Sequence, residues 1–220
     1  MNPTKPICCL ITGFEPFGGS TLNPSQLVIE HLIDAPISLQ GVTLQTALLP
    51  VDTQRIASEI DRLWRQCEPD IVLHFGESAK ASHMTLERIA INLLDFDSPD
   101  NAGQCIADQP IDPGGPDARF VTLPVRAVRD QLAQHGIETA LSLSAGAYLC
   151  NQSLYLSLAH AEKRGGCAVG FVHVPSLQEQ VEQGERSKPS MLGDQLVVQA
   201  QQLILEVIDH HRASNSVSRH

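Results

Sequence analysis

The amino-acid sequence predicts an α/β fold, in which a single domain forms a three-layer sandwich: a mostly parallel, twisted sheet with helices on both faces. Short apolar runs of strand length alternate along the chain with longer segments whose apolar residues recur at helical spacing. The chain has 220 residues, of which 42% are hydrophobic and 18% charged, a balance typical of a globular domain with a sizeable core. We expect residues 1–212 to form the domain and residues 213–220 to form a polar, frayed C-terminal tail.

The first third of the chain is expected to supply three strands and two helices. Residues 7–12 form a continuous apolar run, which is typical of a buried parallel strand. After a glycine-rich turn, Asn23 can cap a helix that has Pro24 at its first position, because the N–H that proline lacks would be unpaired there anyway. The same patterns predict a strand over residues 42–49, a helix over 53–66 and a strand over 70–75.

The middle of the chain has weak periodicity. Residues 76–86 show none and are expected to be irregular, whereas residues 88–94 alternate apolar side chains with others and favour a strand. Residues 95–116 are rich in Asp, Pro and Gly, so we expect one long loop there. Long loops in compact domains are often functional.

Clear alternation of elements returns in the last part of the chain. Apolar spacing predicts a helix over residues 124–135 that stops at Gly136, followed by a strand over 137–143. The remaining elements are predicted as a helix over 151–161, a strand over 168–174 and a long helix from Pro189–Ser190 to about residue 211.

Charge and cysteine usage narrow the classes of partner. The net charge of −10 argues against a nucleic-acid backbone or an anionic membrane, since both require clustered Lys and Arg. No apolar run approaches the roughly 20 residues of a bilayer span, and the N-terminus does not resemble a signal peptide. The six cysteines show no metal-ligand spacing, so we expect reduced thiols in a cytoplasmic protein that needs no metal and no other cofactor.

Cys150 is the first candidate for chemistry. Small residues at 144–146 turn the chain after a predicted strand and place Cys150 at or near the start of a helix. Unpaired backbone N–H groups and the helix dipole favour a thiolate there, and the thiolate is the nucleophilic form of cysteine. The alternative is a buried, inert cysteine, the usual fate of a free thiol.

A nucleophilic cysteine requires a base, and the base requires a group that orients it. His173 stands at the end of a predicted strand, where it is either the base or a core histidine with satisfied hydrogen bonds. Glu87 and Asp100 are the candidates for orienting His173. Their alternatives are a surface charge paired with Arg88 for Glu87 and a turn residue for Asp100. Spacing along the chain leaves this choice open.

Five segments, in one order along nearly the whole chain, resemble the pyroglutamyl peptidase I family of cysteine peptidases, also called pyrrolidone-carboxylate peptidases. The N-terminal segment is TGFEPFGG at 12–19 with NPS at 23–25, and the second segment is ERIAIN at 87–92. The middle-loop segments are PDNAG at 99–103, QPI at 109–111 and GGP at 114–116. SAGAYLCN at 144–151 is similar to the family's nucleophile motif, and FVHVP at 171–175 to its histidine motif.

The resemblance implies an activity and a role for each matched residue. Cys150 would be the nucleophile, His173 the base and then the acid, and Glu87 the orienting group, with Asp100 as the alternative. The substrates would be peptides with an N-terminal pyroglutamate, and the assembly a homodimer or homotetramer. The substrate-binding residues would be Phe14 and Phe17 as an aromatic wall for the lactam ring, Glu77 through its backbone, and Leu149.

One segment departs from the family's pattern. Where the family has a sequence similar to Gly-Gln-Ala-Gly-Gly-Arg, this chain has GESAKA at 76–81, and Gln178 stands where the family tends to have proline. A carboxylate at Glu77 near the pocket would raise the desolvation cost of ionising both Glu77 itself and the Cys150 thiol. The departure leaves a catalytically silent, peptide- or partner-binding homologue as the alternative function. A phosphate-binding loop at residues 13–20 is a further alternative, although Gly19 occupies the place of the lysine that such loops use.

Overall fold

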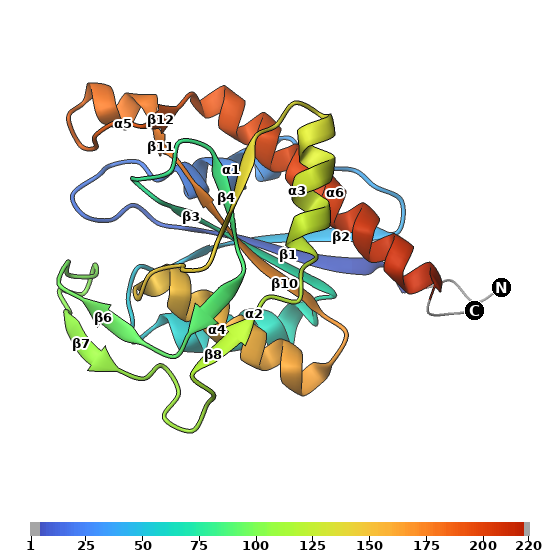
Figure 1. Cartoon of the computed structure of the whole chain (residues 1–220), viewed down its shortest axis with the longest axis horizontal. Coiled ribbons are helices and arrows are strands. Elements are labelled where there is room, and N and C mark those ends of the chain that lie inside the picture. The colour runs from blue at the N-terminus through green and yellow to red at the C-terminus, as the bar shows by residue number, and fades with distance from the viewer. Residues whose placement is uncertain (1–4, 218–220) are drawn as a thin grey trace.

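A six-stranded sheet forms the centre of the computed structural model, which describes residues 5–217 (Figure 1). The order of the strands across the sheet is β2-β1-β3-β10-β4-β9. Their bounds are β1 (Ile7–Phe14), β2 (Val42–Leu49), β3 (Ile71–Glu77), β4 (Met84–Glu87), β9 (Thr139–Ser142) and β10 (Ala168–Val174). Every pair of neighbours is parallel except β10 and β4, which are antiparallel. The predicted mostly parallel sheet is therefore confirmed.

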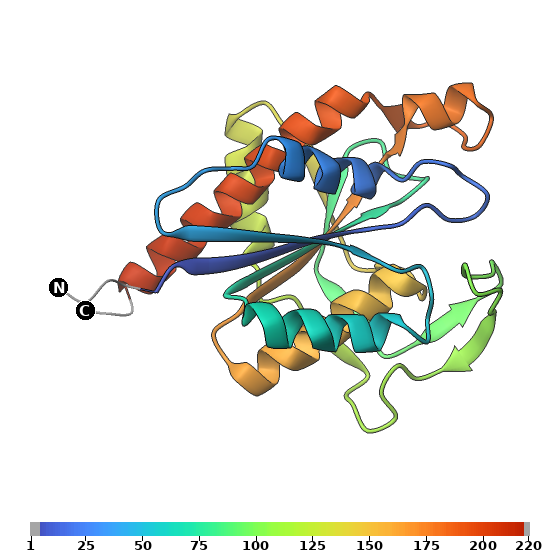
Figure 2. The ribbon, with the colours of Figure 1, turned by 180° about the vertical axis from the view of Figure 1, so that it is seen from behind.

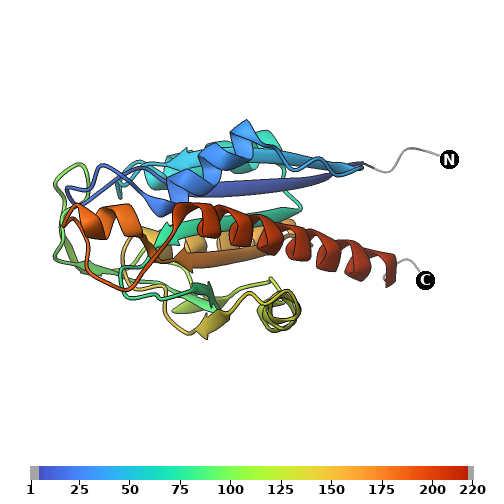
Figure 3. The same cartoon turned by 90° about the horizontal axis from the view of Figure 1, so that it is seen from above.

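Helices cover both faces of this sheet, as Figures 1 and 2 show from opposite sides. One face carries α1 (Pro24–Asp34), α3 (Val125–Gln134) and α6 (Gly193–Val217), which share one apolar core cluster. The other face carries α2 (Ile56–Cys67) and α4 (Leu149–Arg164), which belong to a second cluster. Figure 3 shows α6 running along the sheet between α1 and α3. The three-layer sandwich predicted from the sequence is confirmed.

The start of α1 illustrates how local sequence sets an element. Asn23 accepts a hydrogen bond from the Ser25 backbone N–H (2.9 Å) and has extended backbone angles, as a helix cap requires, and Pro24 begins the helix. Gly13 packs against the backbone of this turn. A Cβ atom at position 13 would lie only 2.4 Å from the Ser25 carbonyl oxygen, so a larger residue would not fit. The glycine therefore lets the end of β1 approach α1 closely.

The middle of the chain is more ordered than the sequence predicts. Residues 84–87 form β4 inside the sheet, so the expected irregular stretch over 76–86 is wrong there. The predicted strand over 88–94 is two strands, and the predicted long loop over 95–116 contains part of a hairpin. The strands of this region are β5 (Ile89–Ile91), which pairs with β8 (Ala118–Phe120), and β6 (Leu94–Phe96), which pairs with β7 (Ile106–Gln109).

Short elements near the C-terminus were also missed. Between β10 and α6 the chain forms β11 (Ser176–Leu177), α5 (Gln178–Glu182) and β12 (Ser190–Met191). Helix α6 continues to Val217, past the expected end near residue 211, so residues 213–217 are helical. Residues 218–220 of the predicted tail lie outside the described residues. Over the described part of the chain, no helix is both long enough and apolar enough to cross a lipid bilayer.

Candidate active site

Cys150 lies in the first turn of α4, as the sequence predicts. The helix begins at Leu149, its cap is the extended residue Tyr148, and the turn before it contains Gly146 at φ +78°. Cys150 is partly exposed, whereas Cys9 is fully buried and burial raises the pKa of the Cys9 thiol to about 12. The inert, buried thiol of the alternative interpretation therefore describes Cys9 and not Cys150.

The approach of Cys150 to the sheet depends on Gly76. A Cβ atom at this position of β3 would lie 2.9 Å from the Cys150 Sγ atom and 2.7 Å from the ring of Phe171. Real side chains do not tolerate such distances, so only glycine lets the N-terminus of α4 settle on the end of β3. This contact places the thiol against the carboxyl end of the parallel strands, where sites of such sheets form.

Strand pairing brings His173 and Glu87 together. The antiparallel register sets His173 of β10 opposite Thr85 of β4, and Glu87 lies two positions along β4 on the same face of the sheet. The His173 Nδ1 atom is 2.7 Å from the Glu87 Oε1 atom, and both residues are buried. The second Glu87 oxygen, Oε2, is buried and has no hydrogen-bond partner among the described residues. The interpretation of Glu87 as a surface charge is therefore wrong.

His173 is held in its charged form by its two neighbours. Burial alone lowers the pKa of His173, but hydrogen bonds and charges from Cys150 and Glu87 overcome this effect and raise the pKa to about 9. The imidazole thus has a thiol on one side and a carboxylate on the other. This arrangement can shuttle a proton between sulfur and a reacting group while the carboxylate fixes the ring.

Asp100 lies elsewhere, and its role as an alternative orienting group is not supported by its contacts. Its Oδ2 atom accepts hydrogen bonds from the Thr53 backbone N–H (2.9 Å) and hydroxyl (2.8 Å). Its Oδ1 atom accepts hydrogen bonds from the backbone N–H groups of Ala102 and Gln104. Asp100 therefore ties its own loop to the chain just before α2, as its alternative interpretation as a turn residue indicates.

A small pocket opens beside the Cys150 thiol. All four predicted substrate-binding residues line it, namely Phe14, Phe17, Glu77 and Leu149. Sequence reasoning missed three further lining residues, Asn23, Val51 and Tyr148. The sequence indicates only a helix cap at Asn23, and it places Tyr148 only within the nucleophile motif. Val51 carries no signal in the sequence, because it is one apolar residue in a loop.

The Glu77 side chain does not fill this pocket. Its Oε1 atom accepts hydrogen bonds from the Ser176 hydroxyl (2.7 Å) and from Arg186 Nε (2.8 Å). Strand β1 pairs with β3 only as far as Thr12 and His74, and the Ser78 N–H donates to β10. Because backbone groups alternate in direction along a strand, the Glu77 N–H and C=O face the side of β1, where the pocket lies.

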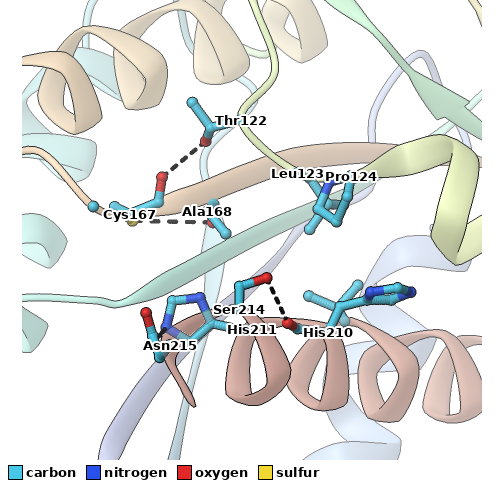
Figure 4. Close-up of a pocket in the computed structure, with 11 residues that line it drawn as sticks. Thr122, Leu123, Pro124, Cys167, Ala168, His210, His211, Ser214 and Asn215 are labelled. Carbon is cyan, nitrogen blue, oxygen red and sulfur yellow. Dashed lines mark hydrogen bonds between the residues drawn. The ribbon is translucent and has the colours of Figure 1, made fainter. Parts of the chain in front are cut away.

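Another pocket lies at the opposite end of β10 and contains none of the predicted site residues (Figure 4). It is formed between the start of β10 and the last turns of α6. The Thr122 hydroxyl donates to the Cys167 carbonyl (2.8 Å) at its edge.

A thiol beside a buried imidazole–carboxylate pair, at the carboxyl ends of parallel strands, is an arrangement that cysteine-type hydrolases use. A family model described as pyroglutamyl peptidase matches residues 7–210. The chain belongs to the pyroglutamyl peptidase family.

Individual relatives agree with this assignment. The chain is 36% identical to the pyrrolidone-carboxylate peptidase of Pyrococcus furiosus, over 90% of this chain and 96% of that protein. It is 39% identical to that of Vibrio parahaemolyticus, over 91% and 92% of the two chains. The solved pyrrolidone carboxyl peptidase from Thermus thermophilus superposes with a TM-score of 0.81 and 40% identity, covering 90% of this chain and 99% of that one.

Proposed function

We propose that this protein removes an N-terminal pyroglutamyl residue from peptides, with Cys150 as nucleophile, His173 as acid and base, and Glu87 as the group that orients His173. The observation that carries the proposal is the position of the Cys150 thiol. It lies at a helix N-terminus beside His173, whose pKa it raises, and the His173 Nδ1 atom is 2.7 Å from the buried Glu87 carboxylate. Such a setting favours the thiolate–imidazolium pair that acyl transfer requires.

The reaction follows from this pair. The Cys150 thiolate attacks the carbonyl carbon of the pyroglutamyl residue, and unpaired backbone N–H groups in the first turn of α4 stabilise the resulting oxyanion. The C–N bond breaks as the His173 imidazolium gives its proton to the leaving amine, which leaves a thioester on Cys150. Water then loses a proton to the neutral imidazole and attacks the thioester. Pyroglutamate leaves, and the thiolate and imidazolium are restored.

The pocket suits a neutral lactam ring. Phe14 and Phe17 offer apolar faces, while the Glu77 backbone offers one donor and one acceptor for the lactam C=O and N–H. A carboxylate or ammonium clamp is not needed, because the pyroglutamyl group carries no charge. The silent homologue was supported only by the altered segment at 76–81, and the engagement of the Glu77 carboxylate by Ser176 and Arg186 means that this segment adds no free carboxylate to the pocket.

The experiment is hydrolysis of pyroglutamyl 4-nitroanilide under reducing conditions, with alanyl 4-nitroanilide as the control substrate. Wild type is expected to cleave the first and spare the second, and Cys150→Ser is expected to cleave neither while keeping its circular dichroism spectrum. An inactive wild type, or a Cys150→Ser variant that retains activity, would refute the proposal.

We further propose that the protein acts in the cytoplasm, has no nucleic-acid partner and assembles as a homodimer or homotetramer. All six cysteines are free thiols, which suits a reducing compartment. Phe120 and Leu143 are large apolar side chains with 66% and 65% of their surface exposed, and a subunit interface could cover them. Light scattering on the purified protein tests the assembly, and a monomer across the accessible concentrations would contradict it.

A further inference from the structure

Arg186 reaches the candidate substrate pocket from a segment far along the chain. Its Nε atom donates to the Glu77 Oε1 atom (2.8 Å), and its Nη2 atom lies 3.3 Å from Glu77 Oε2. The same Nη2 atom donates to the Phe17 backbone carbonyl at 3.3 Å. One guanidinium therefore contacts two pocket-lining residues that are 60 positions apart in the chain.

The guanidinium also supports the aromatic wall. The carbon atom at its centre lies 5.3 Å from the centre of the Phe17 ring, within the range of a cation–π contact. Phe17 in turn lies beside Tyr148, with 6.4 Å between the ring centres. Arg186 thus contacts both the backbone and the ring of Phe17.

Glu77 requires such a partner. Its side chain is only 1% exposed and that of Arg186 is 13% exposed, so the ion pair is almost dry. A buried carboxylate without a counter-charge is costly, and removing one member of a buried pair leaves the other uncompensated. Without Arg186 the carboxylate would keep the Ser176 hydroxyl as a partner but would have lost its counter-charge, beside a pocket lined mainly by apolar residues. The pair therefore keeps a negative charge out of a site built for a neutral ring.

The segment that carries Arg186 is itself tied to the Phe17 turn. The neighbouring Glu185 accepts a hydrogen bond from the Ser20 hydroxyl, and Gln180, which is fully buried, donates to the same hydroxyl (3.0 Å). The Arg186 backbone N–H donates to the Gln180 carbonyl (3.1 Å). These hydrogen bonds hold the segment around Arg186 against the Phe17 turn, so the guanidinium has a defined position in the folded protein.

We propose that Arg186 is a positioning residue for the lactam pocket: through Glu77 and Phe17 it holds both walls in place and neutralises the buried carboxylate. The inference rests on the proposed function, because it takes the group in the pocket to be a pyroglutamyl ring. Arg186 touches no reacting atom, so its contribution belongs to substrate affinity and not to the chemical step.

The test measures kcat and KM for pyroglutamyl 4-nitroanilide in Arg186→Met, Glu77→Gln and the double variant. Methionine keeps the unbranched apolar part of the side chain but lacks the charge and the guanidinium that contacts Glu77 and Phe17. KM is expected to rise on the order of tenfold in each single variant, because each leaves one buried charge unpaired. In the double variant both charges are gone, and KM is expected to return to within about threefold of wild type. Throughout, kcat should stay within about threefold, since the catalytic pair is intact.

A purely structural role gives a different pattern. If Arg186 only stabilised the fold, Arg186→Met would reduce the active fraction, lowering kcat with KM unchanged, and Glu77→Gln would not rescue it. Either that pattern or an unchanged KM would overturn the inference. Arg129→Met is the matched control, because Arg129 pairs with Asp130 on the exposed face of α3, and its kinetics should equal those of wild type.

Two further measurements keep the outcome decisive. If Arg186→Met does not fold, Arg186→Lys keeps the charge, and KM should still rise a few-fold because an ammonium lacks the planar fork that serves Glu77 and Phe17 together. An unchanged KM in that variant overturns the inference. Binding of 2-pyrrolidone, the bare lactam, is measured by NMR without turnover. Wild type that binds it but hydrolyses nothing refutes the proposed function alone, and if wild type and Arg186→Met bind it equally the inference fails.

Discussion

Glu87→Gln removes the negative charge that faces His173 while keeping the size of the side chain and one acceptor oxygen. In the wild-type protein the Glu87 carboxylate and the Cys150 side chain together raise the pKa of His173 from 6.5 to about 9 against the effect of burial. Each pKa unit corresponds to about 1.4 kcal/mol, so the two neighbours favour the imidazolium by about 3 kcal/mol net of burial. A hydrogen bond to a charged group is typically worth about 1.5–3 kcal/mol, so loss of the Glu87 charge should remove roughly 2 kcal/mol of this stabilisation.

This free energy translates into a rate. A loss of about 2 kcal/mol in stabilising the imidazolium corresponds to a fall in kcat/KM of roughly 30-fold. The pKa of His173 should also fall, so the alkaline limb of the pH profile should move from near pH 9 toward neutrality. The assay is kcat/KM for pyroglutamyl 4-nitroanilide across pH, with the melting temperature recorded alongside. A variant that keeps more than half of the wild-type kcat/KM with an unmoved alkaline limb would refute the reasoning.

Three other changes test the site and its support. Gly76→Ala would place a Cβ atom 2.9 Å from the Cys150 Sγ atom and displace the thiol. In steady-state assays on the folded variant kcat should therefore fall at least about tenfold. An unchanged kcat would show that the close approach of Gly76 does not position Cys150. Asp100→Asn should lower the free energy of unfolding in urea by about 1–3 kcal/mol and leave kcat within about threefold, whereas a crippled kcat would make Asp100 the orienting group. Burial lowers the pKa of His74 to about 3, so below pH 6.5 the unfolded chain binds a proton that the folded chain refuses. The contribution of His74 to the free energy of unfolding should then be lower by about 2 kcal/mol near pH 5 than near neutrality. It is measured as the difference in pH dependence between wild type and His74→Asn, and a variant with the same pH dependence as wild type would exclude His74 as the cause.

The elements that sequence predicted well have local causes. Strand β2 has the predicted bounds of residues 42–49, and α1 begins where Asn23 and Pro24 place it, because capping and strand patterns act over a few residues. Strand β4 could not be found in this way. It has four residues, too few for a period, and it is a strand because β10 and β9 bind it from both sides. Whether the domain ends at residue 212 stays a prediction.

The candidate site likewise contains residues that local sequence identifies and residues that only the folded chain brings together. Cys150 could be singled out because its helix start is local, and His173 because it ends an apolar strand. The pairing of Glu87 with His173 is fixed by the antiparallel register of β4, so spacing alone could not choose between Glu87 and Asp100. Nothing in the sequence linked Glu77 to Arg186, which meet only in the folded chain.

The catalytic residues and the residue that supports the substrate pocket are held by parts of the fold that differ in stability. Glu87 and His173 belong to backbone-paired strands in the middle of the sheet, so they separate only when the core opens. Arg186 is carried between β11 and β12 by a short segment with several exposed residues, which can open by local unfolding at a smaller free-energy cost. Amide hydrogen exchange should therefore be much faster over residues 183–188 than in β10. On warming or in mild denaturant, the affinity for substrate should therefore fall before the Glu87–His173 pair is disrupted.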